Sequence, residues 1–200
     1  MKKGLLLTIS GPSGVGKGTI IRKLKKKYPD FVFPVSSTTR EKREKEVEGE
    51  VYNFISKKEF EEGIEKGDFL EYAQVHEQDY YGTPRKPIMD ALEAGEVVIR
   101  EVDIQGAHSI MKEVPDENLV SIFIRAESAE KLIGRIFKRG KLPEEEMERR
   151  MESMEREMAD IESFDYVVWN YEGQLADCMK EVEDIVEKET KEADLKIDAE

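Results

Sequence analysis

"ISGPSGVGKGTI", residues 9–20, places four glycines around a single lysine and continues the apolar run of residues 5–9. It contains the spacing G-x-x-x-x-G-K, with Gly11, Gly16 and Lys17 at the specified positions. Glycine lets backbone N–H groups converge on phosphate oxygens, because no Cβ stands between them. The lysine reaches the β- and γ-phosphates, and a helix that begins there adds the positive end of its dipole. The stretch therefore predicts a phosphate-binding loop between a strand and a helix.

The predicted loop departs from the usual pattern at one position. Gly18 stands where such loops normally carry the hydroxyl that meets Mg²⁺, and Thr19 follows it. Because Mg²⁺ readily keeps several waters, we expect nucleotide oxygens and water to hold the ion, with Thr19 nearby. The form G-K-G-T is similar to that of nucleoside monophosphate kinases and unlike that of most GTPases. The residues predicted to line the triphosphate are Gly11, Pro12, Ser13, Gly14, Val15, Gly16, Lys17, Gly18 and Thr19.

Apolar segments rich in β-branched residues alternate with helical patterns along much of the chain. Strands are predicted at Leu5–Ser10, Val32–Ser36, Val97–Val102, Leu119–Arg125 and Tyr166–Trp169. Helices are predicted at Gly18–Tyr28, Pro87–Ala94, Ile104–Val114, Ser128–Lys138, Pro143–Ser163 and Gln174–Glu189. Near-continuous apolar strands separated by helices indicate an α/β fold, with a central parallel sheet covered on both faces.

Residues 37–83 interrupt this alternation, because they are polar and rich in turn-forming residues. Within them we expect strands at Val51–Ile55 and Phe69–Gln74 and a short helix that begins after Ser56. The segment is predicted to form a small mixed insertion at the edge of the sheet. A second insertion, strongly charged, is expected around Arg139–Glu146.

Composition and charge narrow the class of protein. A chain of 200 residues suffices for one well-buried domain, and a formal net charge of −13 argues against a nucleic-acid binder. Cys178 is the only cysteine, which excludes an internal disulfide and suits a reducing compartment. The apolar run Leu5–Ile9 is too short for a signal peptide or a membrane span. We therefore expect a cytoplasmic protein without a membrane or nucleic-acid partner.

Further motifs follow the loop in a fixed order. Together with the loop they read GPSGVGKGT, VSSTTREKR, GEVYNF, EYA, YYGTP, VDIQGA and RIFKRG. From Leu5 to about Glu187 the chain resembles the guanylate kinases, which phosphorylate GMP with ATP. The resemblance implies a P-loop three-layer sandwich with a central parallel sheet, an inserted GMP-binding lobe and a helical lid. The core is then expected at residues 1–36, 84–134 and 163–190, the lobe at 37–83, the lid at 135–162 and a polar tail at 191–200.

The family pattern implies that GMP, and dGMP as a related substrate, binds to one set of residues. These are Ser36, Arg40, Arg43, Tyr52, Glu71, Tyr81, Thr83 and Asp103. Arginine and phenolic O–H groups suit the phosphate of a nucleoside monophosphate. Guanine presents N1–H and N2–H₂ as adjacent donors that adenine lacks, and the carboxylate of Glu71 is expected to accept both. The hydroxyls of Ser36 and Thr83 and the carboxylate of Asp103 are expected to complete the recognition of the base.

The predicted reaction needs positive charge rather than a general base. A phosphate monoester has a second pKa near 6, so the acceptor is already an oxyanion at neutral pH. The resemblance implies that the charge comes from Lys17, Arg40, Arg135, Arg139 and Arg150. It also implies that Arg135 and Arg139, in the lid, and Asn170, after the last strand, contact ATP.

Other readings of the same motifs remain open. A guanylate-kinase-like scaffold domain would bind proteins without catalysis, but its phosphate loop would be degraded, whereas Gly11, Gly16, Lys17 and Thr19 are kept here. A GTPase is suggested by D-x-x-G in "VDIQG", residues 102–106, although the chain lacks the N-K-x-D or T-K-x-D that reads guanine. Adenylate and shikimate kinases share the loop but not the residues expected to bind GMP.

Overall fold

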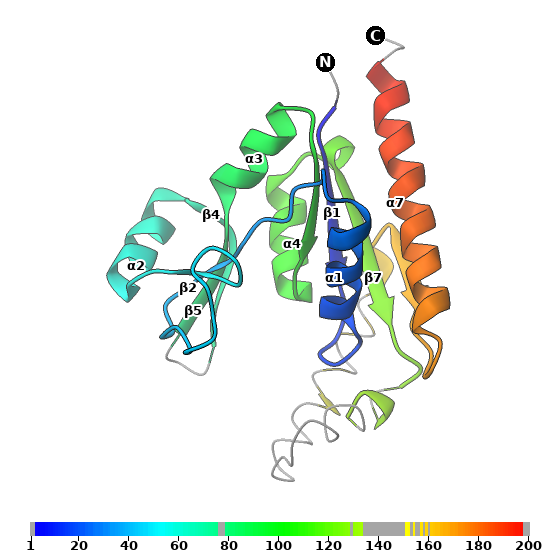
Figure 1. The fold of residues 1–200 in the computed structure, drawn as a ribbon, viewed down its shortest axis with the longest axis horizontal. Coiled ribbons are helices and arrows are strands. Elements are labelled where there is room, and N and C mark those ends of the chain that lie inside the picture. The colour runs from blue at the N-terminus through cyan, green and yellow to red at the C-terminus, as the bar shows by residue number, and fades with distance from the viewer. Residues whose placement is uncertain are drawn as a thin grey trace.

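The computed structural model describes residues 3–75, 79–128, 130–133, 151, 152, 154, 157, 159 and 161–197. Its central sheet is parallel, with the strand order β6-β1-β7-β8 (Figure 1). The strands are β1 (Leu5–Ser10), β6 (Val97–Glu101), β7 (Leu119–Arg125) and β8 (Tyr166–Trp169). The helices around it are α1 (Lys17–Lys27), α3 (Arg85–Glu93), α4 (Ile104–Glu113) and α7 (Leu175–Ile197). The predicted α/β class with a parallel sheet is confirmed.

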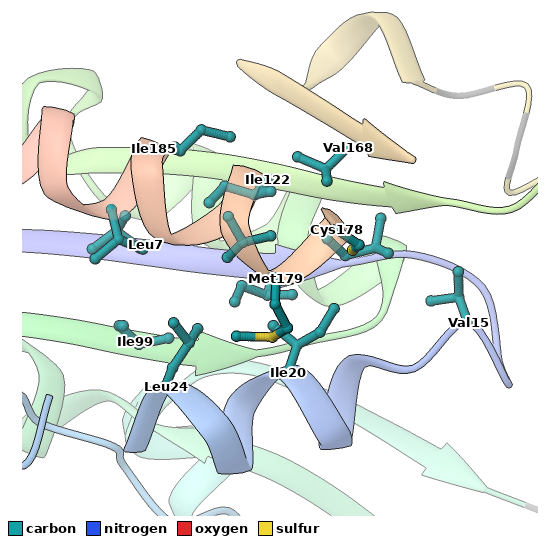
Figure 2. Packing of buried hydrophobic residues seen from close by; sticks show 14 of the residues in the cluster. Leu7, Val15, Ile20, Leu24, Ile99, Ile122, Val168, Cys178, Met179 and Ile185 are labelled. Carbon is teal, nitrogen blue, oxygen red and sulfur yellow. The ribbon is translucent and has the colours of Figure 1, made fainter. Parts of the chain in front are cut away.

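Strand β1 is buried along its whole length, and its side chains alternate between two apolar clusters. Leu7 belongs to the cluster that contains Ile20 of α1 and Met179 of α7, as Figure 2 shows. Leu6 belongs to the other cluster, together with Ile88 of α3 and residues of α4. The two clusters place a helical layer on each face of the sheet, which makes the sandwich of three layers.

A second, mixed sheet with the order β3-β2-β5-β4 is separate from the central one. Its strands are β2 (Ser37–Thr38), β3 (Asn53–Phe54), β4 (Phe69–Val75) and β5 (Asp79–Pro84). Strands β2 and β3 are parallel, whereas β5 is antiparallel to both β2 and β4. Figure 1 shows this sheet, with helix α2 (Lys57–Lys66), beside the central one. The predicted mixed insertion is therefore present.

The inserted unit has a small aromatic core of its own. Helix α2 begins with a capping box, in which Ser56 and Glu59 each satisfy a backbone N–H of the other residue. This start places Phe60 under the sheet, fully buried. Its ring stacks on that of Phe69 at 4.2 Å and on that of Tyr80 at 5.1 Å, measured between centroids. These contacts hold β4 and β5 in place, and several of the residues predicted to bind GMP lie on these two strands.

The strand predicted at Val32–Ser36 is wrong. Only Val32 pairs with the sheet, through hydrogen bonds of 2.9 Å with Val97 and Ile99 on β6. Pro34 has no N–H to donate, so the ladder stops before it. The sequence also failed to predict β2 and β5, and it made β3 longer than it is, at Val51–Ile55 rather than the two residues observed.

Two helices extend beyond their predicted bounds. Helix α3 begins at Arg85 rather than Pro87, and α7 continues to Ile197 rather than ending at Glu189. Residues 191–197, expected in the polar tail, belong to the last turns of α7, and Ala193 among them is buried. Of the helices predicted over residues 128–138 and 143–163, most residues lie outside the described part, and Ile161–Ser163 forms a 3-10 turn. A further 3-10 turn is found at Asp116–Asn118. No helix in the described residues has the length and apolarity that crossing a membrane requires.

Candidate functional site

Two glycines of the loop after β1 have positive φ angles and lie very close to neighbouring segments, so a side chain would not fit at either position. Gly11 has φ 138°, and a Cβ there would lie 2.3 Å from the carbonyl oxygen of Ile124 on β7. Gly16, with φ 111°, precedes the first turn of α1, and a Cβ there would lie 3.0 Å from Nδ2 of Asn170. The chain can therefore pass this close to β7 and β8 only with glycine at these two positions.

Two residues hold the backbone of this loop in place, Val15 within the loop and Asn170 directly after β8. The Val15 side chain is fully buried in the core, where Figure 2 shows it at the turn of the loop, and its N–H donates to the Pro12 carbonyl at 3.2 Å. The Asn170 side chain is also buried, and its Nδ2 donates to the Val15 carbonyl at 2.7 Å. The ATP contact that the resemblance implies for Asn170 stays a prediction, and the structure shows that its Nδ2 lies on the loop backbone.

Asn170→Ala is expected to loosen the loop, because the buried Val15 carbonyl loses its side-chain donor. An unsatisfied buried group costs about 1–3 kcal/mol, so the free energy of unfolding in urea should fall by about that amount. The KM for the ATP that the sequence predicts at this loop should rise at the same time. Asn118→Ala is the matched control, because Asn118 Nδ2 donates to the Gly4 carbonyl at 2.7 Å, beyond the opposite end of β1. An equal rise of the KM in both variants would contradict the role of Asn170.

A cavity of about 460 Å³ lies over the loop. Of the predicted triphosphate-binding residues, it is lined by Gly11, Ser13, Gly14, Gly16, Lys17, Gly18 and Thr19. Lys17 Nζ donates to the carbonyls of Gly11 at 2.5 Å and Pro12 at 3.3 Å, which keeps the ammonium beside the loop. Burial lowers the pKa of Lys17, while the nearby carboxylates of Glu101, Glu157 and Asp103 act in the opposite direction. The cavity thus combines backbone N–H groups with a desolvated cation.

A larger cavity of about 670 Å³ adjoins the first. It is lined by five of the residues predicted to bind GMP, namely Ser36, Tyr52, Glu71, Tyr81 and Asp103. Lys17, Glu101 and Asp103 line both cavities and so form a common wall. Two ligands bound in the two cavities would meet at Lys17.

One end of the larger cavity holds two carboxylates near the start of α4. Asp103 caps this helix, accepting a hydrogen bond from the Gly106 N–H at 2.7 Å. A Cβ on Gly106 would lie 3.2 Å from both Asp103 Oδ1 and Glu71 Oε2, so glycine allows both carboxylates to approach the helix. The fully buried hydroxyl of Thr83 donates a short hydrogen bond to Glu71 Oε1. Burial raises the pKa of Glu71, and the Thr83 hydrogen bond and the Arg100 charge lower it.

The other predicted GMP residues gather around two tyrosine rings. Tyr52 and Tyr81 meet edge to face, with ring centroids 5.6 Å apart, and the Arg40 guanidinium lies 5.1 Å from the Tyr52 centroid. Arg40 Nη1 and Nη2 donate to the two oxygens of Glu46 at 2.7 and 2.6 Å, and the Arg43 N–H donates to the same carboxylate at 2.9 Å. These bonds raise the pKa of Arg40 and lower the pKa of Glu46 to about 2. Arg40 is thus held beside the tyrosines by a carboxylate that the sequence analysis did not single out.

Three site residues were missed from the sequence, namely Glu46, Arg100 and Glu101. Arg100 and Glu101 are adjacent charges in a strand that is otherwise apolar, and this was the signal that could have revealed them. Glu46 stands among other charged residues, and nothing in the sequence distinguishes it from them. Arg135, Arg139 and Arg150, predicted to act in the lid, lie outside the described residues.

Comparison with known proteins shows the family to which this chain belongs. The family model for guanylate kinase matches residues 3–189. Guanylate kinase from Clostridioides difficile (strain 630) is 47% identical over 189 residues, covering 94% of this chain and 90% of that protein. Guanylate kinase from Helicobacter pylori (strain ATCC 700392 / 26695) is 46% identical over 165 residues, covering 82% of this chain and 79% of the relative. The crystal structure of guanylate kinase from Anaplasma phagocytophilum has a TM-score of 0.73 at 31% identity, covering 94% of this chain and 87% of that one. The chain belongs to the guanylate kinase family.

Proposed function

We propose that this protein transfers the γ-phosphoryl group of ATP to GMP, giving ADP and GDP. The observation that carries the proposal is the common wall of Lys17, Glu101 and Asp103 between the two cavities. ATP binds over the glycine-rich loop, and GMP binds in the larger cavity with its phosphate towards Lys17. The two phosphates then face each other across one cation, as direct transfer requires.

In this proposal the inserted unit selects GMP. Glu71 accepts the guanine N1–H and N2–H₂, while Ser36, Thr83 and Asp103 surround the base. Tyr52, Tyr81, Arg40 and Arg43 bind the phosphate of GMP. Because both Nη atoms of Arg40 donate to Glu46, the phosphate of GMP must share this guanidinium with the Glu46 carboxylate or replace it there.

Charge neutralisation accounts for the proposed chemistry. The GMP phosphate is an oxyanion near neutral pH and attacks without a general base. Loop N–H groups and Lys17 stabilise the charge on the β- and γ-phosphates of ATP. From the family resemblance we extend the proposal to Arg135, Arg139 and Arg150, which would add positive charge from a lid over residues 135–162.

The proposed metal ion is Mg²⁺ bound with ATP, and it would supply charge neutralisation of the phosphates. In the described residues no group of three His, Cys, Asp or Glu side chains could hold a metal by itself. A hydroxyl near the loop lysine fits the ion better, and Thr19, two residues after Lys17, lines the loop cavity. We therefore assign to Thr19 a supporting contact, with nucleotide oxygens and water as the main ligands.

A coupled assay of ADP release tests the proposal. With ATP and Mg²⁺, turnover is expected with GMP and dGMP, and turnover with AMP, CMP and UMP should be at least about 10³-fold lower in kcat/KM. ATP hydrolysis without an acceptor is the control. No turnover with GMP would contradict the proposal, and equal turnover with AMP would contradict the role given to Glu71.

A further inference from the structure

Arg100 is a charged residue of β6 that forms part of the wall of the larger cavity. Its Nε donates to Thr83 Oγ1 at 3.0 Å, and its Nη1 donates to the Pro34 carbonyl at 2.9 Å. Its Nη2 donates a short hydrogen bond to Ser36 Oγ. One guanidinium thus joins two hydroxyls that both belong to the proposed GMP-binding set.

These contacts determine the direction of both hydroxyl hydrogens. A guanidinium has N–H donors and no acceptor, so Ser36 and Thr83 must each accept from Arg100. The hydrogen of each hydroxyl must therefore point elsewhere. Thr83 directs its hydrogen to Glu71 Oε1. Among the residues that the structure describes, the Ser36 hydroxyl has no acceptor, and Ser36 lines the cavity.

We propose that Arg100 is a positioning residue for purine discrimination, which sets Ser36 as a hydrogen-bond donor and Glu71 as an ionised acceptor towards the base. This inference rests on the proposed function, since it concerns the nucleotide in the larger cavity. A purine with a 6-oxo group offers an acceptor to the Ser36 hydrogen. Adenine offers an amino group at the same position, so two donors would face each other.

The Arg100 guanidinium also stabilises the ionised form of Glu71. Glu71 is faced by Thr83 from β5, by Arg100 from β6 and by Asp103 from the start of α4, and the backbone of α4 lies close to it at Gly106. Burial raises the pKa of Glu71 and Asp103 raises it further, whereas Thr83 and Arg100 lower it. Tyr52 and Glu101 are the other titratable groups near Arg100. Without Arg100 the pKa of Glu71 should rise, so GMP binding should be lost at a higher pH as the solution is acidified.

The test compares Arg100→Met, which keeps an unbranched side chain, with Arg100→Lys, which keeps the charge. Steady-state kinetics are measured with GMP, IMP and AMP as acceptors. For Arg100→Met the KM for GMP and for IMP should each rise about 10- to 100-fold, with smaller changes in kcat and in the KM for ATP. IMP shares the 6-oxo group and the N1–H of GMP but lacks its 2-amino group, so a parallel loss excludes an effect confined to the 2-amino contact. The weak turnover of AMP should not fall.

The pH profile separates the two parts of the role. In Arg100→Met, the acidic limb of kcat/KM for GMP should move to higher pH. In Arg100→Lys it should stay near that of the parent, because the charge beside Glu71 remains. The preference for GMP over AMP should nevertheless fall in Arg100→Lys, because an ammonium cannot hold both hydroxyls as the planar guanidinium does.

Arg85→Met is the matched control, because Arg85 Nε donates to the Gly67 carbonyl and its Nη2 pairs with Glu113, outside the residues lining either cavity. It should leave the nucleotide preference and the pH profile unchanged. Equal losses with GMP, IMP and AMP, or an unchanged KM for GMP, would overturn the role of Arg100. If Arg100→Met does not fold, Arg100→Lys alone tests the proposal. An unchanged preference for GMP over AMP in Arg100→Lys would also overturn the role of Arg100. Absence of GMP turnover in the parent enzyme would instead contradict the proposed function.

Discussion

Lys17→Ala should lower kcat by at least about 10³-fold while the protein remains folded. The Lys17 ammonium lies in the wall common to both cavities, where no other Lys or Arg lines both among the described residues. Because the Lys17 ammonium is partly buried, which also lowers its pKa, its charge acts on the phosphates with less screening than a surface charge. Removing it should therefore affect the transition state for transfer more than the binding of either nucleotide. Single-turnover kinetics with saturating ATP and GMP measure the chemical step directly.

The stability of Lys17→Ala should stay within about 1 kcal/mol of the parent, because a desolvated charge contributes little net free energy to folding. Lys23→Ala is the control, since Lys23 is an exposed lysine on the same helix. It should leave both kcat and the thermal unfolding temperature unchanged. A loss of kcat in Lys17→Ala below about tenfold would show that other groups neutralise the phosphates. A loss of folded structure would show that the loop depends on the lysine.

The loop and the first helix could be predicted from the sequence, because their signals are local. Glycine spacing, the apolar strand before it and the lysine after it are all contained in residues 5–20. The place of Glu71 in the wall of the larger cavity also agrees with the family pattern, while its contact with the base stays a prediction. These predictions depend on chemistry that each residue carries irrespective of its distant neighbours.

The remaining features depend on contacts between distant segments. Val32–Ser36 reads as a strand because it is apolar, but Pro34 ends the pairing with β6 after one bridge. Strand β5 contains Tyr80, Tyr81, a glycine and a proline, so its strand character comes from antiparallel pairing with β4. The hydrogen bond from the Asn170 amide to the buried carbonyl of Val15 likewise joins the end of β8 to a loop 155 residues earlier in the chain. Local propensity carries no information about such partners.

The same limit applies to the polar network in the wall of the larger cavity. Arg100 is 64 residues from Ser36 and 17 from Thr83, and only the packing of β6 beside the inserted unit brings them together. The Arg40–Glu46 pair is closer in sequence, but Glu46 is one of several acids in a charged segment. Hydrogen-bond geometry is needed to single it out.

Glu71→Gln should invert part of the preference for the base. Thr83 donates to Glu71 Oε1, so the oxygen of the new amide should stay at that position and its NH₂ should take the place of Oε2. The pair of guanine donors would then meet one acceptor and one donor. Two hydrogen bonds to a carboxylate are weakened or lost, so kcat/KM for GMP should fall by about 10²–10³-fold. Adenine presents an N1 acceptor that the new NH₂ can satisfy, so kcat/KM for AMP should stay equal or rise.

The comparison of acceptors at constant ATP measures this change, and isothermal titration with GMP and AMP separates binding from chemistry. Glu65→Gln, on the exposed face of α2 in the same inserted unit, is the control and should change neither substrate. The variant should also lose the part of the acidic limb that belongs to Glu71, because an amide does not titrate, while the part that belongs to the GMP phosphate remains. If GMP and AMP lost activity by the same factor, Glu71 would act on the shape of the cavity and not on the donors of the base. If the acidic limb of the variant coincided with that of the parent, Glu71 would not contribute to it.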